Sequence, residues 1–183
     1  MQEVFEDLYD KYHHDLFQFL FYMVRNKQLA EDLSQEVYIN IIKSYDSFKG
    51  NSSEKTWIFS IARHAAIDYF RGQKRRKKHI MDLFDIGENS PLIQDSDPIP
   101  EEMAVQNEEI KEIYECLEHC TIDQKTVIIL RYIQDLSIQE TAEILGWSLS
   151  KVKTTQHRGM KALRTLLEQK VGEEGVRREA KEL

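Results

Sequence analysis

The sequence lacks several features that mark common functional classes. Only two cysteines and three prolines occur among its 183 residues, and two cysteines are too few for the disulfide framework of a small secreted domain. No stretch approaches the roughly 18 apolar residues of a membrane-spanning helix, and no secretory signal opens the chain. A Gly-rich phosphate loop is missing, as is a nucleophile with a base and an orienting partner. We therefore predict a cytoplasmic protein that is not inserted in a membrane, is not an enzyme and uses no cofactor.

The two cysteines do not predict a metal site. Cys116 and Cys120 lie four residues apart on a predicted helix, and His119 lies between them. A structural zinc site needs further ligands at a comparable short spacing, and the sequence offers no second pair. We interpret the cysteines as buried structural thiols, with metal ligation by this trio as the alternative.

The few prolines are concentrated in one place. Pro91, Pro98 and Pro100 lie in the acidic segment GENSPLIQDSDPIPEE, and a helix cannot run through such a segment because proline lacks the backbone donor and restricts the preceding residue. We therefore predict an all-α protein of two small helical domains joined by an acidic, proline-containing linker. The predicted ranges are 1–78 for the first domain, 79–102 for the linker, 103–170 for the second domain and 171–183 for a charged tail.

Apolar residues recur at three- and four-residue steps, which indicates amphipathic helices. One helix is expected near residues 3–26, a second around Leu33, Val37 and Ile41, and a third over Thr56–Gln73. No segment alternates strictly over the length of a strand, so essentially no sheet is expected. The predicted inward-facing positions of the third helix and of the segment after residue 120 are Trp57, Ile61, Ala65, Val127, Leu130 and Tyr132.

Residues 136–164 predict a helix-turn-helix. Ser137 and Glu140 have the spacing of a capping box, Gly146 suits a left-handed helix end, and Ser148 or Ser150 can cap the next helix. On that second helix Val152, Met160 and Leu163 are expected to face inward. No acidic residue occurs from Leu149 to Leu167. A helix of this kind enters the DNA major groove. The predicted DNA-facing residues are Lys151, Lys153, Thr154, His157 and Arg158.

Charge is segregated along the chain, although the net charge is −7. Residues 71–78 (RGQKRRKK) hold six cations and no anion, whereas residues 82–118 hold twelve carboxylates and the single cation Lys111. DNA binding depends on the cations that meet phosphates, so local charge counts for more than the total. Two basic surfaces separated by an acidic spacer predict a DNA-binding protein that requires a partner.

The N-terminal domain carries two further polar features. Asp32, Gln35, Glu36 and Asn40 form a stripe on one helix, which is either a solvated face or a partner surface. The polar loop Lys49–Thr56 leads into a segment that mixes aromatic residues with cations, a combination that holds single-stranded nucleic acid. The aromatics can equally be core, and residue types alone leave these two interpretations open. The candidate nucleic-acid contacts here are Asn51, Ser52, Ser53, Lys55, Arg63 and Arg71.

The order of these motifs resembles the bacterial RNA polymerase sigma factors of the extracytoplasmic-function group. AEDLSQEVYINIIKSYDSFKG is similar to their polymerase-binding helix, TWIFSIARHAAIDYFRGQKRR to their −10 and promoter-melting region, and residues 123–166 to their −35 domain. The resemblance implies that Asp32, Gln35 and Glu36 dock on the β′ clamp helices of core polymerase, with the β subunit as a further contact. It implies that loop 50–56 captures a flipped −10 base, and that Lys153, Thr154, His157 and Arg158 face the −35 element of promoter DNA. It also implies a membrane-anchored anti-sigma factor.

A second class of protein shares some of these features. A stand-alone regulator would join an N-terminal sensing or dimerisation bundle to a helix-turn-helix and bind two half-sites as a symmetric dimer. The basic and aromatic stretch 55–78 argues against this class, because a sensing bundle does not need it. A third class, an adaptor that makes protein contacts only, does not explain the basic second helix of the helix-turn-helix.

Overall fold

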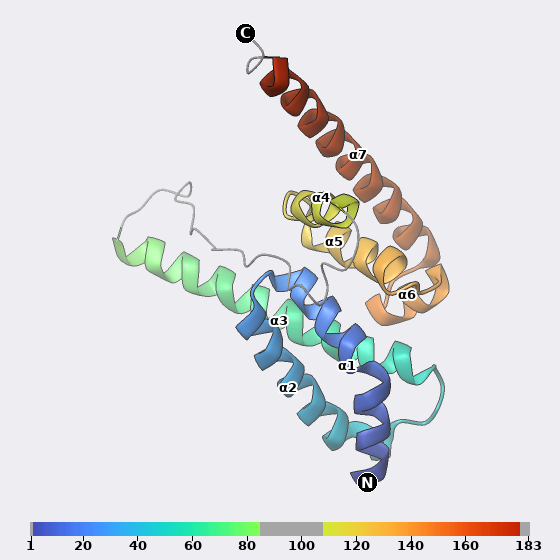
Figure 1. Ribbon diagram of the computed structural model, residues 1–183. Helices are drawn as coiled ribbons and strands as arrows, with labels where there is room; N and C mark the ends of the chain where they lie inside the picture. Colours follow the sequence, from blue (N-terminus) through green and yellow to red (C-terminus); the bar gives the residue numbers. More distant parts are fainter. Residues whose placement is uncertain (1, 85–107, 180–183) are drawn as a thin grey trace. The chain divides into compact units, whose positions relative to one another are not determined.

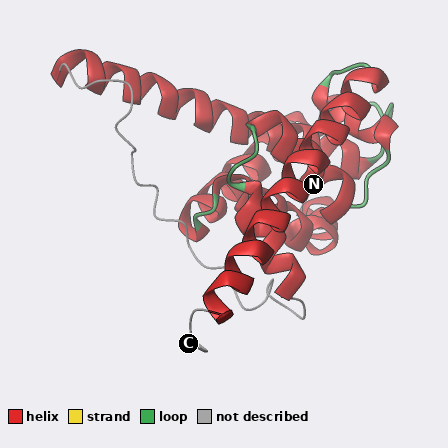
Figure 2. Cartoon of the chain, turned by 90° about the horizontal axis from the view of Figure 1, so that it is seen from above, coloured by secondary structure: helices red, strands yellow, loops and turns green. Residues whose placement is uncertain are grey.

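The computed structural model describes residues 2–84 and 108–179. These residues form helices and loops without a strand, so the predicted all-α fold is confirmed (Figure 2). The chain divides into two compact units, Met1–Pro98 and Ile99–Leu183. Within the described ranges each helix is too short or too polar to cross a bilayer. The predicted domain limits stay predictions, and most of the predicted linker, residues 85–102, lies outside the described residues.

The first unit is built from three helices that all pack against one another (Figure 1). They are α1 (Gln2–Val24), α2 (Lys27–Ser44) and α3 (Glu54–Phe84), with a short 3₁₀ turn, η1 (Tyr45–Ser47), after α2. Asn26 caps α2 by accepting a hydrogen bond from the Leu29 backbone N–H at 2.8 Å. Aromatic and aliphatic side chains fill the space between the helices, and Phe19 meets Phe59 edge-on at 5.4 Å between ring centres.

The buried face of α3 differs from the predicted one. Ile58, Phe59 and Ala62 are essentially inaccessible to solvent, whereas Trp57 and Ile61 are partly exposed. Trp57 turns away because its indole stacks on Phe48, with ring centres 4.7 Å apart. The prediction of Ala65 as inward-facing was right, but the stripe as a whole was displaced by about one residue.

Helix α3 also runs past both predicted ends. It begins at Glu54 instead of Thr56 and continues through the basic run to Phe84, beyond residue 78. Arginine, lysine and glutamine are good helix formers, and no proline occurs before Pro91. Nothing in this stretch therefore stops the helix, and the basic residues become a part of it.

The second unit places three short helices against one long helix. These are α4 (Glu108–Leu117), α5 (Ile122–Ile128) and α6 (Ile138–Leu145), and each packs on α7 (Leu149–Glu179). A π-helical turn, η2 (Ile129–Ile133), follows α5 directly. Helix α7 extends into the range predicted as a charged tail. Thr121 and Gln124 form a capping box at the start of α5.

The predicted helix-turn-helix is present as α6 and α7. Ser137 Oγ accepts from the Glu140 N–H at 3.1 Å, and Glu140 Oε2 accepts from the Ser137 N–H at 2.7 Å. Gly146 ends α6 with φ 62°, in the left-handed region that glycine adopts without strain. Of the two serines considered for the next cap, Ser148 is the one that accepts from the Lys151 N–H, at 3.2 Å.

The inward face of α7 contains a glycine where the sequence suggested a methionine. Val152 and Leu163 are buried as predicted, but Met160 is 40% exposed. Gly159 is buried in its place, and a Cβ atom there would lie 2.8 Å from Ile128 Cδ1 and 3.3 Å from Gln124 Cβ. The absence of a side chain lets α5 approach α7 closely, and the helix turns Met160 outward.

We predict opposite effects for alanine at two of the helical glycines, Gly159 and Gly72. Gly159→Ala should destabilise the second unit by about 1 kcal/mol, because overpacking of about 1–3 kcal/mol outweighs the gain in helix propensity of about 1 kcal/mol. Gly72→Ala on α3 meets no atom within 4 Å and should stabilise the first unit by about 0.5–1 kcal/mol. Thermal unfolding followed by circular dichroism measures both changes, and a stabilising Gly159→Ala would contradict the close approach.

Candidate functional site

One side of α7 is packed and the other is covered with polar and cationic side chains. The five predicted DNA-facing residues are all exposed on its first turns, opposite the buried Val152 and Gly159. The Lys151 ammonium lies 3.7 Å from the centre of the Trp147 ring, in the turn of the helix-turn-helix. This cation–π contact holds Lys151 at the helix start. The exposed residues are Lys151, Lys153, Thr154, His157 and Arg158.

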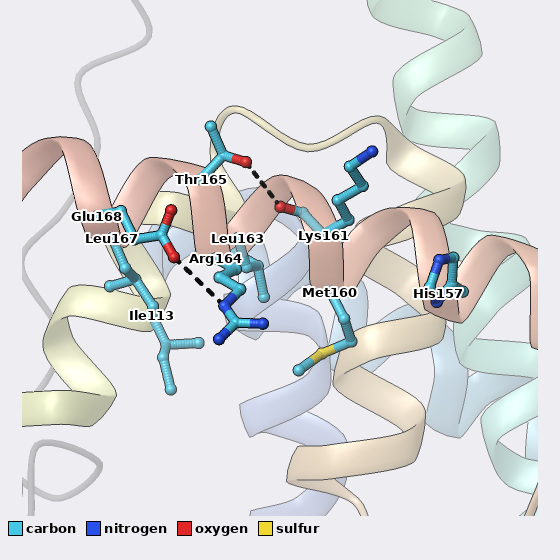
Figure 3. A pocket seen from close by; sticks show the side chains of 9 residues that line it. All are labelled: Ile113, His157, Met160, Lys161, Leu163, Arg164, Thr165, Leu167 and Glu168. Atoms are coloured by element: carbon cyan, nitrogen blue, oxygen red, sulfur yellow. Dashed lines mark hydrogen bonds and ion pairs between the residues drawn. The ribbon is translucent and has the colours of Figure 1, made fainter.

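Further along α7, an open groove of about 1070 Å³ is lined mostly by this helix, from His157 to Glu168, with Ile113 of α4 on one side (Figure 3). Ile113 of α4 and Met160 and Leu167 of α7 supply apolar side chains to its wall. The Arg164–Glu168 ion pair, at 3.3 Å, lies along it. Sequence reasoning missed this groove, because it interpreted Met160 as core. The sequence carried no signal for it, because the exposure of Met160 depends on the packing of Ile128 against Gly159.

Helix α2 presents the predicted polar stripe to solvent. Asp32, Gln35 and Glu36 are all exposed, and Gln28 Nε2 donates to Asp32 Oδ1 at 3.1 Å. Two apolar residues continue this side of the helix, because Ile39 is 51% and Ile42 43% exposed. Sequence reasoning missed these isoleucines. The exposed side of α2 is therefore partly apolar as well as acidic.

The loop between α2 and α3 is shorter than predicted, because Glu54, Lys55 and Thr56 already belong to the helix. Gly50 has φ +67° and provides the turn. Ser53 caps α3: its Oγ accepts from the Thr56 N–H at 3.1 Å and lies 2.8 Å from Thr56 Oγ1. Asn51 and Ser52 remain in the loop, with Asn51 exposed and Ser52 partly exposed.

Aromatic side chains brace this loop from both ends. Phe48 stands before it and Trp57 after it, and their stacked rings join the two ends, with Tyr45 also against Trp57 at 6.1 Å. Phe59 is fully buried. Phe59 is therefore a core residue, whereas Trp57 packs on Phe48 and Tyr45 and remains partly exposed. Tyr69 and Phe70 are partly exposed further along α3.

The predicted cations of this region lie in three different environments. Lys55 Nζ is 3.0 Å from Asp15 Oδ2 of α1 and 5.7 Å from the centre of the Phe59 ring, so it ties α3 to α1. Arg63 is partly buried, and its Nε has no hydrogen-bond partner in the described part of the chain. Arg71 is exposed and pairs with Asp68 at 3.4 Å. Most of the basic run after Arg71 is exposed as well.

The cysteines lie at the end of α4. Cys116 is buried and Cys120 is partly exposed. Burial raises the pKa of the Cys120 thiol, which keeps it protonated at neutral pH. Among residues 2–84 and 108–179, no group of three or more His, Cys, Asp or Glu side chains is arranged to hold a metal ion.

Two family profiles match the chain, one for each unit. The profile Sigma-70 region 2 matches residues 8–76, and the profile Sigma-70, region 4 matches residues 110–163. The first match covers the three-helix unit with the acidic stripe and the braced loop. The second contains the helix-turn-helix.

Whole-chain comparisons agree with the profiles. The ECF RNA polymerase sigma factor SigX of Bacillus subtilis is 56% identical over 92% of this chain and 86% of its own. The sigma factor YlaC of the same organism is 35% identical over 84% of this chain and 86% of its own. The structure of sigma factor RpoE, solved with the anti-sigma factor NepR from Bartonella quintana, shares the fold with a TM-score of 0.66 at 22% identity, over 89% of this chain and 98% of that one. This chain therefore belongs to the ECF RNA polymerase sigma factors, the proteins that give RNA polymerase its promoter specificity at transcription initiation.

Proposed function

We propose that the two units have different tasks in transcription initiation. The first unit binds core polymerase and recognises the −10 element, and the second unit recognises the −35 element. The observation that carries the proposal is the exposed face of α7, which has no acidic residue from Leu149 to Leu167. The same chain also has the acidic and apolar face of α2, so it offers one surface for DNA and one for a protein. The chain binds core polymerase, brings it to promoters and assists strand opening, without catalysing a reaction itself. The alternative of a stand-alone dimeric regulator is not favoured, since both sigma regions are matched in one chain.

The face of α2 is proposed as the dock for the β′ clamp helices. Asp32 and Glu36 supply negative charge one helical turn apart, and Ile39 and Ile42 supply apolar contact next to them. Charge complementarity sets the orientation of a partner, while desolvated apolar side chains at the centre of an interface supply much of the affinity. Gln35 on the same side provides a neutral hydrogen-bonding group.

For the −10 element, the proposal places base recognition in the loop and phosphate binding on α3. Ser53 is engaged as a helix cap, so the groups that can read a flipped base are those of Asn51 and Ser52. Lys55 is held by Asp15, which favours Arg71 and the exposed cations after it for contacts with neighbouring phosphates. Arg63 lies between Lys55 and Arg71 on α3 and is partly exposed; because its Nε is buried, the proposal assigns an additional contact to its terminal guanidinium nitrogens.

For the −35 element, the proposal assigns the exposed start of α7 to the major groove. Lys153, Thr154, His157 and Arg158 are on one side of the helix, and residues near a recognition helix N-terminus reach base edges. Lys151 sits above Trp147 at the helix start, a position that suits a phosphate.

Two protein partners complete the proposal. The groove along α7 beside Ile113 of α4 presents apolar walls to a partner, which fits a contact with the polymerase β subunit. His157, which is proposed to face the −35 element, lines the same groove, so the DNA surface and the partner surface meet at this residue. The sigma factor RpoE was solved with an anti-sigma factor, and we infer that a membrane-anchored anti-sigma factor holds this protein inactive in the cytoplasm. The acidic and apolar surfaces for polymerase are the ones such an inhibitor would cover.

Transcription with purified components tests the function directly. Core polymerase and this protein together should transcribe a subset of a promoter pool, and sequencing of the transcribed fragments should recover paired −35 and −10 elements. The protein alone should be monomeric and bind duplex DNA poorly, because its net charge of −7 opposes the polyanion. A free homodimer that binds duplex tightly at physiological salt would support the regulator instead.

Charge reversal tests the polymerase dock. The double variant Asp32→Lys/Glu36→Lys should lose about 2–5 kcal/mol of affinity for core polymerase, the range seen when a buried charge loses its partner at an interface. Its helix content should be unchanged, because both side chains are exposed. Binding is measured by fluorescence anisotropy of the labelled protein.

A matched control reverses two other negative charges on the first unit, so that the change in net charge is the same. Asp7 and Asp10 are exposed on α1, and Asp7→Lys/Asp10→Lys should bind polymerase like the parent protein. Equal affinity for all three proteins would mean that the α2 stripe is only a solvated face.

A restricted loop exchange tests −10 recognition. Asn51 and Ser52 are replaced by the corresponding residues of a sigma factor with another −10 preference, while Gly50 and Ser53 are kept because they provide the turn and the cap. Transcription from a library of −10 variants should show the donor's preference. The −35 requirement and the affinity for polymerase should not change. An active chimera that keeps its original −10 preference would place the specificity along α3.

A further inference from the structure

The π-helical turn η2 presents two polar side chains beside the recognition helix. Within this turn Leu130 is buried, whereas Tyr132 is 52% exposed, contrary to its predicted place in the apolar stripe. A π-helical turn holds more residues than an α-helical one, which shifts the side chains that follow, and such turns often occur at functional sites. The exposed phenol contributes little to the core, so its position calls for another explanation.

Gln156 of α7 fixes the two side chains of this turn. Its Oε1 accepts from Arg131 Nε at 3.2 Å, and its Nε2 donates to the Tyr132 hydroxyl at 2.8 Å. Arg131 Nη1 also donates to the Leu136 carbonyl, just before α6. An amide bonded at both ends keeps one orientation, so the Tyr132 phenol is held against α7.

The position of Gln156 places the phenol at the edge of the cationic face. Gln156 and Lys153 are three residues apart on α7 and therefore neighbours on its surface. Because the Tyr132 oxygen accepts from Gln156, its own proton can be donated outward. An O–H donor next to a lysine suits a phosphate oxygen, and tyrosine is among the side chains that bind DNA phosphates.

We propose that Tyr132 binds a backbone phosphate at the edge of the −35 element, and that Gln156 is the residue that positions it. This inference rests on the proposed function, because it requires α7 to lie in the groove of the −35 duplex. A phosphate contact carries no sequence information, so Tyr132 fixes the register of α7 on the duplex and leaves base reading to the exposed residues of α7.

The test uses holoenzyme assembled from core polymerase and the full chain, with promoter fragments that differ in the −35 element. Tyr132→Phe removes only the hydroxyl and should weaken binding about three- to tenfold, the range for one hydrogen bond. The loss should be equal for all −35 sequences, and the salt dependence should stay the same because phenol is uncharged. Lys153→Ala should instead lower the salt slope by about one or relax the preference for one base. Tyr9→Phe on α1, also a partly exposed tyrosine, should have no effect.

Methylphosphonate substitution, one phosphate at a time, locates the contact. With the parent protein, one backbone position beside the −35 element should carry a penalty that disappears in Tyr132→Phe and shrinks in Gln156→Ala. Three results would each overturn the inference. They are an unchanged affinity of Tyr132→Phe, a changed preference at one base pair, and methylphosphonate penalties in Tyr132→Phe that equal those of the parent protein at every position. If the parent holoenzyme itself ignores the −35 element, the proposed function fails. If it responds to Lys153→Ala but not to Tyr132→Phe, only this inference fails.

Discussion

The close approach of α5 to α7 at Gly159 is the contact on which the second unit depends. Ile128 occupies the space that a side chain at position 159 would take, and Val152 and Leu163 are buried on the same side of α7. This packing fixes the rotation of α7 about its own axis. The cations are therefore exposed because the opposite face is filled. A single helix thus belongs to the core and to the nucleic-acid surface at once.

Features that depend on residues close in sequence could be predicted. The capping box of Ser137 and Glu140 and the left-handed Gly146 follow from local backbone chemistry, and both are present in the structure. The exposed stripe of Asp32, Gln35 and Glu36 follows from helical periodicity. For the same reason the helix-turn-helix and the all-helical fold could be inferred without coordinates.

Features that depend on distant partners could not be predicted. Lys55 looked like a free loop cation, but its partner Asp15 is forty residues earlier in the chain. Grouping Tyr132 with Leu130 in one stripe was wrong, because two residues correspond to about 200° around a helix axis and place the exposed Tyr132 opposite the buried Leu130. Gly159 is buried where Met160 was expected, because Ile128 of α5 leaves no room for a side chain at the position that faces it. Periodicity says which face is buried only when the helix is regular and its neighbour is known.

The unbroken course of α3 has a geometric consequence for the promoter. A helix rises about 1.5 Å per residue, so Glu54 and Arg71 are about 25 Å apart along the axis. Under the proposed function, α3 fixes the distance between the base-reading loop and the basic run, and at about 100° per residue it also fixes the angle between them about the helix axis. Inserting or deleting one residue between the two ends would change both this distance and this angle.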